Sequence, residues 1–174
     1  MTRTIDATIT YLEMTAPPIR RSAAPLGPML ALMRADEMPL HFYRYLYREI
    51  GSNHHWVERH GVLDETLSDM IQAEGIEISV LYADGVPAGY FEIDERNPDA
   101  VNVAYLGLMP EWTGRGLGPY LLTCALDRAW REAPEKVTIN TNTLDHPAAL
   151  PLYQKFGFSP VGQEKKTFEV PHDF

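Results

Sequence analysis

A glycine-rich turn is the part of this sequence whose residue types are best suited to chemistry. It spans residues 113–118 with the sequence TGRGLG, and an apolar stripe at helical spacing follows it as far as Arg131. Glycines let several backbone N–H groups point at one spot, and the first turn of a helix adds unpaired N–H groups and the positive end of its dipole. Arg115 adds a full positive charge. The turn therefore predicts an anion site that suits a diphosphate.

The spacing of the glycines distinguishes between the diphosphate sites that such a turn can form. A dinucleotide turn has glycines at the first, third and sixth positions of G-x-G-x-x-G, and Pro119 occupies the sixth position here. A P-loop needs a G-K-[ST] tripeptide, which the sequence does not contain. A nucleotide-binding protein that prefers NAD or ATP is therefore the weakest interpretation, and the spacing of Gly116 and Gly118 favours a third type of turn.

A second block near the C-terminus reads AALPLYQKFGF over residues 148–158. Together with the turn and its lead-in, LMPEW over residues 108–112, it resembles the signatures of the GNAT acetyltransferases. Their turn reads Q/R-x-x-G-x-G/A, and their C-terminal block is similar to A-x-x-L-Y-x-K-x-G-F. The resemblance extends from Ile5 to the C-terminus. It implies a GNAT-type α/β fold and direct transfer of acetyl from acetyl-CoA to a primary amine, with no covalent acyl-enzyme.

The resemblance also implies a role for each residue of the site. Acetyl-CoA would lie where two parallel strands, residues 100–109 and 137–142, separate. Tyr153 would protonate the departing thiolate, and Asn142 would be one of the cofactor-binding residues. Backbone groups near two leucines would hold the pantetheine and the thioester, and N–H groups of the turn would hold the pyrophosphate: Leu106 and Leu108 for the first, and Gly114, Arg115, Gly116 and Gly118 for the second.

Three features depart from the family pattern. Thr113 stands where a Gln or Arg is usual, and His146 stands where an Asn is frequent. Asn102 and Ala104 occupy the strand positions at which many members carry a glutamate base. These departures keep open an alternative function, a non-catalytic acyl-CoA-binding or regulatory module on the same fold.

The general base must then come from another part of the chain. Tyr90, Glu92 and Asp94 share one face of their predicted strand, because side chains alternate along a strand. Glu92 is the first candidate for the base and Asp94 is the second. The predicted catalytic residues are therefore Tyr153 and Glu92.

The aromatic-rich stretch before the first loop and the loop itself allow two interpretations. The loop Ser52–Trp56 contains two histidines, which could bind a ligand or act as a base near neutral pH. Equally, Trp56 could tether the loop to the core. In the preceding helix, Tyr43 and Tyr47 lie on the apolar face and should pack, whereas Tyr45 faces away and could line a substrate pocket.

The elements that must position these residues alternate between strand and helix patterns, which predicts a mixed sheet with helices on both faces. Asp84-Gly85 predicts a hairpin turn. Residues 16–39 hold five prolines and predict a loop with one short helix at Met29–Arg34. The predicted strands are Ile5–Met14, Ile76–Val80, Val86–Asp94, Ala100–Met109, Val137–Asn142 and Phe158–Val170, and the predicted helices are Tyr43–Ile50, Asp64–Gly75, Leu117–Arg131 and Pro147–Phe156, with Asp64 and Asp145 as N-caps.

Size and charge limit the classes of function. The chain has 174 residues, which fits a single domain over residues 1–174. A net charge of −9 repels phosphate backbones, so we expect a small-molecule or peptide amine as partner and no nucleic acid. We also expect no membrane segment and a cytoplasmic location, because no apolar run approaches the length of a membrane helix and Met1–Asp6 has no signal-peptide core.

The remaining motifs add little chemistry. Cys124 is the only cysteine, which excludes an internal disulfide, and it falls within an apolar helix pattern where a buried structural thiol is expected. The spacing of His55, Glu58 and His60 does not match H-E-x-x-H, so no metal site is expected. A homodimer is compatible with the sequence, although no residues identify an interface.

Overall fold

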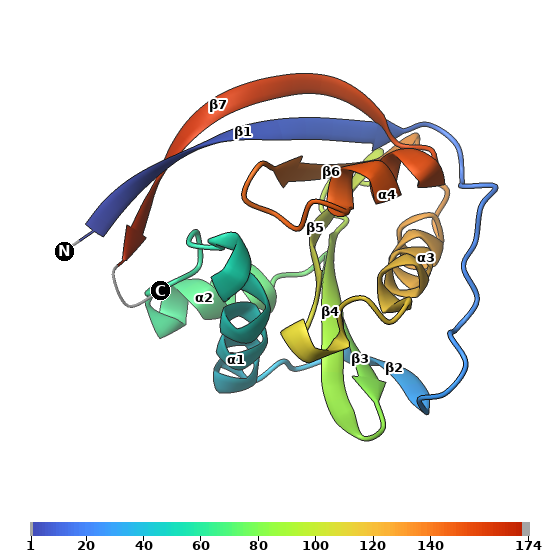
Figure 1. Cartoon of the computed structure of the whole chain (residues 1–174), viewed down its shortest axis with the longest axis horizontal. Helices are drawn as coiled ribbons and strands as arrows, with labels where there is room; N and C mark the ends of the chain where they lie inside the picture. Colours follow the sequence, from blue (N-terminus) through green and yellow to red (C-terminus); the bar gives the residue numbers. More distant parts are fainter. Residues whose placement is uncertain (1, 172–174) are drawn as a thin grey trace.

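The chain forms one mixed sheet with helices on both of its faces. A computed structural model describes residues 2–171, and within this range it has seven strands in the order β2-β3-β4-β5-β6-β1-β7 and four α-helices (Figure 1). This confirms the predicted α/β fold; Met1 and residues 172–174 of the predicted domain lie outside the described residues. The elements are β1 Thr2–Met14, β2 Leu30–Ala35, α1 Leu40–Gly51, α2 Asp64–Ile71, β3 Ile76–Ala83, β4 Val86–Asp94, β5 Ala100–Leu108, α3 Leu117–Ala129, β6 Lys136–Asn142, α4 Ala149–Phe156 and β7 Ser159–Pro171, with 3₁₀ turns at Ser52–His54 and Pro110–Trp112.

The helices pack through the apolar faces that their periodicity predicts. Helix α1 packs against β4 and β5 from one side, and α3 packs against the same strands from the other side (Figure 1). Each large aliphatic or aromatic side chain buried in this way contributes roughly 1.5–3 kcal/mol to stability. Among the described residues, no helix has the length and apolar character needed to cross a bilayer. The buried residues on these two helices include Tyr43, Leu46, Tyr47 and Ile50 of α1, and Leu121, Leu122, Ala125 and Leu126 of α3.

The hairpin between β3 and β4 is confirmed at the predicted dipeptide. Asp84 and Gly85 both have positive φ angles, 50° and 86°, as the central residues of a type I′ turn require. The turn joins two antiparallel strands in the middle of the sheet, one of which carries Glu92.

The two N-terminal strands lie at opposite ends of the sheet. β1 is a strand, as predicted, but it lies between β6 and β7 and is antiparallel to both, so that β1 and β7 run side by side along one end of the molecule (Figure 1). The edge beside β3 belongs instead to Leu30–Ala35, which pairs antiparallel with β3. The prediction of a helix at Met29–Arg34 is wrong, because a helix this short is marginal alone and pairing with β3 satisfies the same backbone groups.

The parallel pair β5 and β6 separates part of the way along its length. The two strands pair from Ala100 with Lys136 to Val103 with Ile139, and then part although β5 continues to Leu108 and β6 to Asn142. On its other side, β5 pairs with β4 with a shift in register that leaves Ala104 as an extra residue. A bulge of this kind bends and twists a strand. The bend therefore lies where the two strands begin to diverge.

Candidate functional site

A cavity of about 170 Å³ opens where β5 and β6 separate. Both strands line it, together with α4, the loop that follows α1 and the connection from β6 to α4. Ile9 of β1 and Phe168 of β7 add apolar wall from the far end of the sheet. The cavity thus draws on segments from almost the whole length of the described chain.

Three of the predicted site residues line this cavity. They are Leu106 on β5, Asn142 at the end of β6 and Tyr153 on α4. Leu108 lies farther along β5, and a Cβ added at Gly118 would come within 3.9 Å of its side chain. Leu108 therefore connects the cavity strand to the glycine turn.

The hydroxyl of Tyr153 is held in its protonated form by its surroundings. The side chain is only 6% exposed and packs edge-to-face against Phe158, with the ring centres 6.1 Å apart. Burial, and to a smaller degree the charge of Asp145, raises the pKa of Tyr153 well above its ordinary value. A phenol that is protonated and lines a cavity can donate a proton to a leaving group.

The glycine turn has the backbone geometry that an anion site needs. Gly114 and Gly116 have φ angles of 72° and 80°, a left-handed conformation that costs a glycine little. Helix α3 begins directly after Gly116 without a side-chain cap, so its first N–H groups lack partners within the helix. A Cβ added at Gly114 would meet no atom within 4 Å, so the space over the turn is open. These features fit a diphosphate.

Two side chains of the turn, Arg115 and Thr113, differ in what they contact. The guanidinium of Arg115 lies 4.7 Å from the centre of the Trp112 ring, and Arg115 itself is exposed. It is therefore held close to the turn with its charge available to an anion. Thr113, at the position where the sequence resemblance implies a Gln or Arg, donates its hydroxyl to the Pro110 carbonyl at 2.8 Å. Thr113 thus closes the 3₁₀ turn that precedes the glycines.

A segment that the sequence interpretation treats only as a loop runs past this turn. Residues 16–29 descend along α3 on their way from β1 to β2 (Figure 1). Arg21 pairs with Asp127 of α3, with nitrogen–oxygen distances of 2.7 and 2.5 Å. Pro25 would lie 3.8 Å from a Cβ added at Gly116. The segment therefore borders the predicted pyrophosphate site, and proline content alone could not reveal this.

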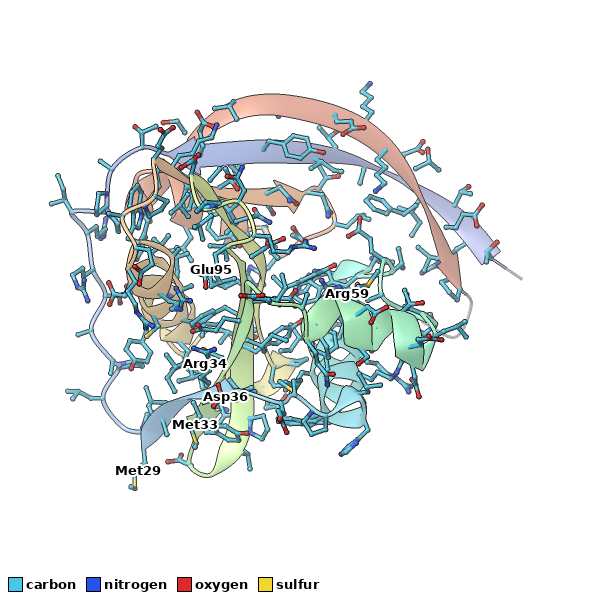
Figure 2. All side chains as sticks on the ribbon, turned by 180° about the vertical axis from the view of Figure 1, so that it is seen from behind. Met29, Met33, Arg34, Asp36, Arg59 and Glu95 are labelled. Carbon is cyan, nitrogen blue, oxygen red and sulfur yellow. The ribbon has the colours of Figure 1, made fainter. Side chains whose placement is uncertain are left out.

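Glu92 lies in a closed cluster of charged and aromatic groups. Its side chain is fully buried, and its two oxygens accept hydrogen bonds from Arg59 at 2.7 and 2.9 Å. Tyr43 donates to the same carboxylate at 3.0 Å and also contacts Arg59. Figure 2 shows Arg59 on the α2 side of the central strands, apart from Arg34 and Asp36 at β2. Glu92 does not line the cavity, and its role as the base stays a prediction.

Asp94, the second candidate for the base, is also paired. Its carboxylate accepts hydrogen bonds from the Arg96 side chain at 2.9 and 2.6 Å. These bonds lower the pKa of Asp94 below its ordinary value. Asp94 borders a different hollow, shared with Asn102.

The loop after α1 combines both of its predicted interpretations. Trp56 packs against the core, with its ring 5.1 Å from that of Tyr105, and it also lines the cavity. His54 and His55 line the cavity beside it. His55 has a φ of 54°, which is uncommon for a residue with a side chain, and its buried Nδ1 has no hydrogen-bond partner among the described residues. The loop is therefore both anchored and open to a ligand.

Three predictions from the sequence are wrong in detail. Tyr45 is 46% exposed and does not line the cavity, whereas Tyr47, expected only to pack, is buried and lines it. Asp145 does not cap α4, because its carboxylate accepts hydrogen bonds from the Thr141 hydroxyl at 2.6 Å and from the Asn142 N–H at 2.9 Å. Asp145 thus closes the end of β6 instead. Asp64 is likewise the first residue of α2 and not its cap, since Leu63 holds that position.

Comparisons with known proteins point to one family. Residues 46–172 match the sequence model of the acetyltransferase (GNAT) domain. No curated protein matches the chain. Among solved structures, a tandem GNAT protein from the clavulanic acid biosynthesis pathway is similar with a TM-score of 0.61 and 20% identity, over 94% of this chain and 53% of that one. A GCN5-related N-acetyltransferase from Kribbella flavida is similar with a TM-score of 0.60 and 15% identity, over 97% and 60% of the two chains.

A third similar structure is an aminoglycoside acetyltransferase from an uncultured soil metagenomic sample, in complex with trehalose. It has a TM-score of 0.59 and 17% identity, over 74% of this chain and 87% of that one. At identities of 15% to 20% the likeness to these structures shows the fold. The chain spans 53% to 62% of the length of three of the structures that it resembles.

Proposed function

Because the chain belongs to the GNAT acetyltransferase family, we propose that it is an acetyl-CoA-dependent N-acetyltransferase that acts on a primary amine of a small molecule or peptide. One observation carries the proposal. The strands β5 and β6 part over a cavity that contains Tyr153, and β5 leads directly to a glycine turn at the start of α3. A long ligand with a diphosphate at one end and a reactive group at the other fits this combination.

The course of β5 supports the proposed cofactor-binding residues. Beyond Val103 the β5 edge has no partner on β6, so backbone groups near Leu106 and Leu108 can bind a pantetheine amide and a thioester carbonyl. The N–H groups at Gly114, Arg115, Gly116 and Gly118 can bind a pyrophosphate, and the Arg115 charge supports them. Asn142, on the opposite strand, lines the same cavity and completes the proposed set.

The chemistry of acetyl transfer gives each residue a task. Acetyl-CoA supplies a thioester carbonyl carbon that a neutral amine can attack. An N–H donor near Leu106 stabilises the negative charge that develops on the carbonyl oxygen as the N–C bond forms. Tyr153 protonates the sulfur as the C–S bond breaks, and a base on the protein takes the proton that the ammonium group loses.

The side chains of the cavity wall support a proposal for the kind of acceptor amine. Tyr47, Trp56 and Tyr105 form a cluster with ring centres 5.1 to 5.6 Å apart, and Ile9 and Phe168 extend the apolar surface. Glu58 and Asp145 supply carboxylates at the same cavity. An amine carried on an apolar body matches such a wall, because the rings attract both the cation and the apolar body.

Calorimetry with acetyl-CoA tests the cofactor site, with NAD and ATP as controls. Gly116→Trp should weaken acetyl-CoA binding about tenfold or more, which corresponds to ~1.4 kcal/mol or more, because the side chain fills the space over the turn. Gly85→Trp is the matched control, since Gly85 also has a positive φ and open space around it but lies in the β3–β4 hairpin. Equal binding by both variants and the wild type, or no binding at all, would contradict the proposal.

Release of free CoA then tests turnover. The wild type should release thiol when acetyl-CoA and a suitable primary amine are both present, and should release almost none without the amine. Tight binding of acetyl-CoA without release in a screen of primary amines would identify a non-catalytic acyl-CoA-binding module instead.

A further inference from the structure

The proposed transfer needs a base that can reach the acceptor amine. The two β5 positions at which the resemblance implies a glutamate base hold Asn102 and Ala104, and neither side chain has a carboxylate. Glu92 engages both of its oxygens with Arg59, which stays protonated at all relevant pH values. Asp94 is paired with Arg96 outside the cavity. The central strands thus offer no carboxylate that is unpaired in the cavity.

Most of the titratable groups that do line the cavity are already engaged. Glu58 accepts from Lys166 at 3.2 Å and from the Tyr105 hydroxyl at 3.3 Å. Asp145 accepts from Thr141, Asn142 and, at 3.4 Å, from Trp56. The Nδ1 atom of His146 accepts from the Ala148 N–H at 3.1 Å. A base at this cavity must combine a free lone pair with access to the space between β5 and β6.

His54 meets this requirement better than its neighbours. The Nδ1 of His55 has no partner among the described residues, but it is buried, and the Nε2 of His55 lies 3.5 Å from the Arg3 guanidinium. It ends the 3₁₀ turn that directly follows α1, so the packing of α1 against the sheet fixes where its backbone lies. Its ring lines the cavity and lies edge-to-face near His146, with the ring centres 6.2 Å apart. It reaches the cavity from the loop after α1, whereas Tyr153 reaches it from α4. His54 and Tyr153 therefore reach the cavity from separate elements, which suits a base and an acid that act on different atoms of the reacting groups.

We propose that His54 is the general base that takes the proton from the acceptor ammonium before or during its attack on the thioester. The first proton moves to an imidazole nitrogen, and the amine lone pair forms the N–C bond. Tyr153 supplies a proton to the sulfur as the C–S bond breaks, and the second proton, which the bonded nitrogen loses, restores the Tyr153 hydroxyl. This assignment rests on the proposed acetyl transfer.

The groups around His54 favour its neutral form near neutral pH. Burial is the main cause that lowers the pKa of His54, and the charges of His146 and His55 act in the same direction. The charge of Asp145 and a backbone hydrogen bond at Leu144 oppose the decrease only in part. A neutral imidazole that donates one N–H to the backbone keeps its second nitrogen as an acceptor. Glu58, Tyr47, Tyr105 and Tyr153 are the other titratable side chains that line this cavity.

The sign of the pH effect follows from this decrease. As the pH rises through the lowered pKa, His54 loses its proton and becomes able to accept one, so kcat/KM should rise with a midpoint below the ordinary histidine value of about 6.5. The acidic limb of the profile should therefore belong to His54 and disappear when the imidazole is removed.

The test compares His54→Gln and His54→Ala with the wild type, using acetyl-CoA with 2-phenylethylamine and a lysine-containing peptide as acceptors. His54→Gln should lower kcat by about 10²-fold or more and remove the acidic limb, with acetyl-CoA binding by calorimetry unchanged. Added imidazole should restore part of the activity of His54→Ala, which a purely structural role would not produce. His41→Gln is the matched control, because His41 is exposed on α1, the helix that leads to the same loop.

Two results would overturn the assignment in different ways. If the wild type and His54→Gln turn over with the same pH profile, or if Glu92→Gln alone removes the acidic limb, His54 is not the base although acetyl transfer stands. If the wild type releases no CoA with any amine, the proposed function fails and the base assignment fails with it.

Discussion

Two polar regions lie on neighbouring strands, and they differ in how far their polar groups are satisfied. The Glu92 cluster of Tyr43, Arg59 and Glu92 is buried, and its carboxylate has a partner for each oxygen. The cavity between β5 and β6 holds His54, His55 and Tyr153, and there the buried Nδ1 of His55 has no partner among residues 2–171. Within the same residues, the buried Tyr90 hydroxyl also has no partner, and its ring packs edge-to-face on Tyr43 beside the Glu92 cluster.

The difference indicates which buried polar groups stabilise the fold and which are available to a ligand. A buried ion pair that is fully bonded stays closed, because breaking it exposes a charge to a medium that cannot solvate it. Buried polar groups without partners cost stability and persist where a ligand can complete them. We therefore expect the paired Glu92 carboxylate to stabilise the fold, and we expect a ligand to bind in the cavity.

The largest expected effect falls on the Glu92 cluster. Glu92→Gln should lower the free energy of unfolding by roughly 3–5 kcal/mol, because it leaves the Arg59 charge buried without a counter-charge. Urea denaturation followed by tryptophan fluorescence measures the change. Arg59→Met combined with Glu92→Leu should recover much of the loss, since neither charge then remains. A stable Glu92→Gln protein without activity would instead favour Glu92 as the base.

Next in size is the loss of the Tyr153 hydroxyl. Tyr153→Phe keeps the packing against Phe158 but removes the proton donor, so kcat should fall by about 10²-fold while acetyl-CoA binding is retained. The CoA release assay gives the rate and calorimetry gives the affinity. Tyr45→Phe, on an exposed side chain outside the cavity, should leave kcat unchanged. Unaltered turnover in Tyr153→Phe would remove Tyr153 from the mechanism.

A smaller effect is expected at Gly107, which lies between the cavity and the core. A Cβ there would overlap the Ile50 side chain and approach the Trp56 ring to 3.1 Å. Gly107→Ala should therefore cost about 1–3 kcal/mol of stability by overpacking and should displace Trp56 from the cavity wall. Gly162→Ala is the control, because a Cβ at that position meets nothing within 4 Å. If both variants melt at the same temperature, the space between Gly107, Ile50 and Trp56 accommodates a methyl group and the prediction is wrong.

The smallest effect is expected at the rim of the cavity. Lys166 and Glu58 form an ion pair of 3.2 Å whose side chains are 45% and 58% exposed. Lys166→Gln should change the free energy of unfolding by no more than about 1 kcal/mol, since water and salt screen exposed pairs. If Lys166→Gln lowered the free energy of unfolding as much as Glu92→Gln, the two regions would not differ in how strongly their ion pairs stabilise the protein.

Much of the geometry of the glycine turn and of the Tyr153 block is predictable from the sequence. The positive φ angles of Gly114 and Gly116 and the start of α3 follow from a local run of glycines before a helix pattern. The position of Tyr153 follows from a block whose residues are contiguous in the chain. Such features depend on neighbours a few residues away, so the spacing of residue types contains them.

The partners of the candidate base are not predictable in this way. The alternation of side chains along a strand correctly places Glu92 on one face of β4. Nothing in the sequence indicates that Arg59, from a polar loop, pairs with it. The same holds for the cavity, to which Ile9 and Phe168 contribute although 159 positions separate them in the chain (168 − 9).

The sequence by itself determined the order of the elements other than β2, the apolar faces of α1 and α3, the hairpin at Asp84-Gly85 and the backbone conformation of the glycine turn, because each depends on local periodicity or backbone freedom. Only the tertiary structure decided that β1 lies between β6 and β7, that Arg59 closes on Glu92, and that His54 borders the same cavity as Tyr153. These outcomes arise when strands pair and side chains pack across long sequence distances, where local patterns contain no information about the partner.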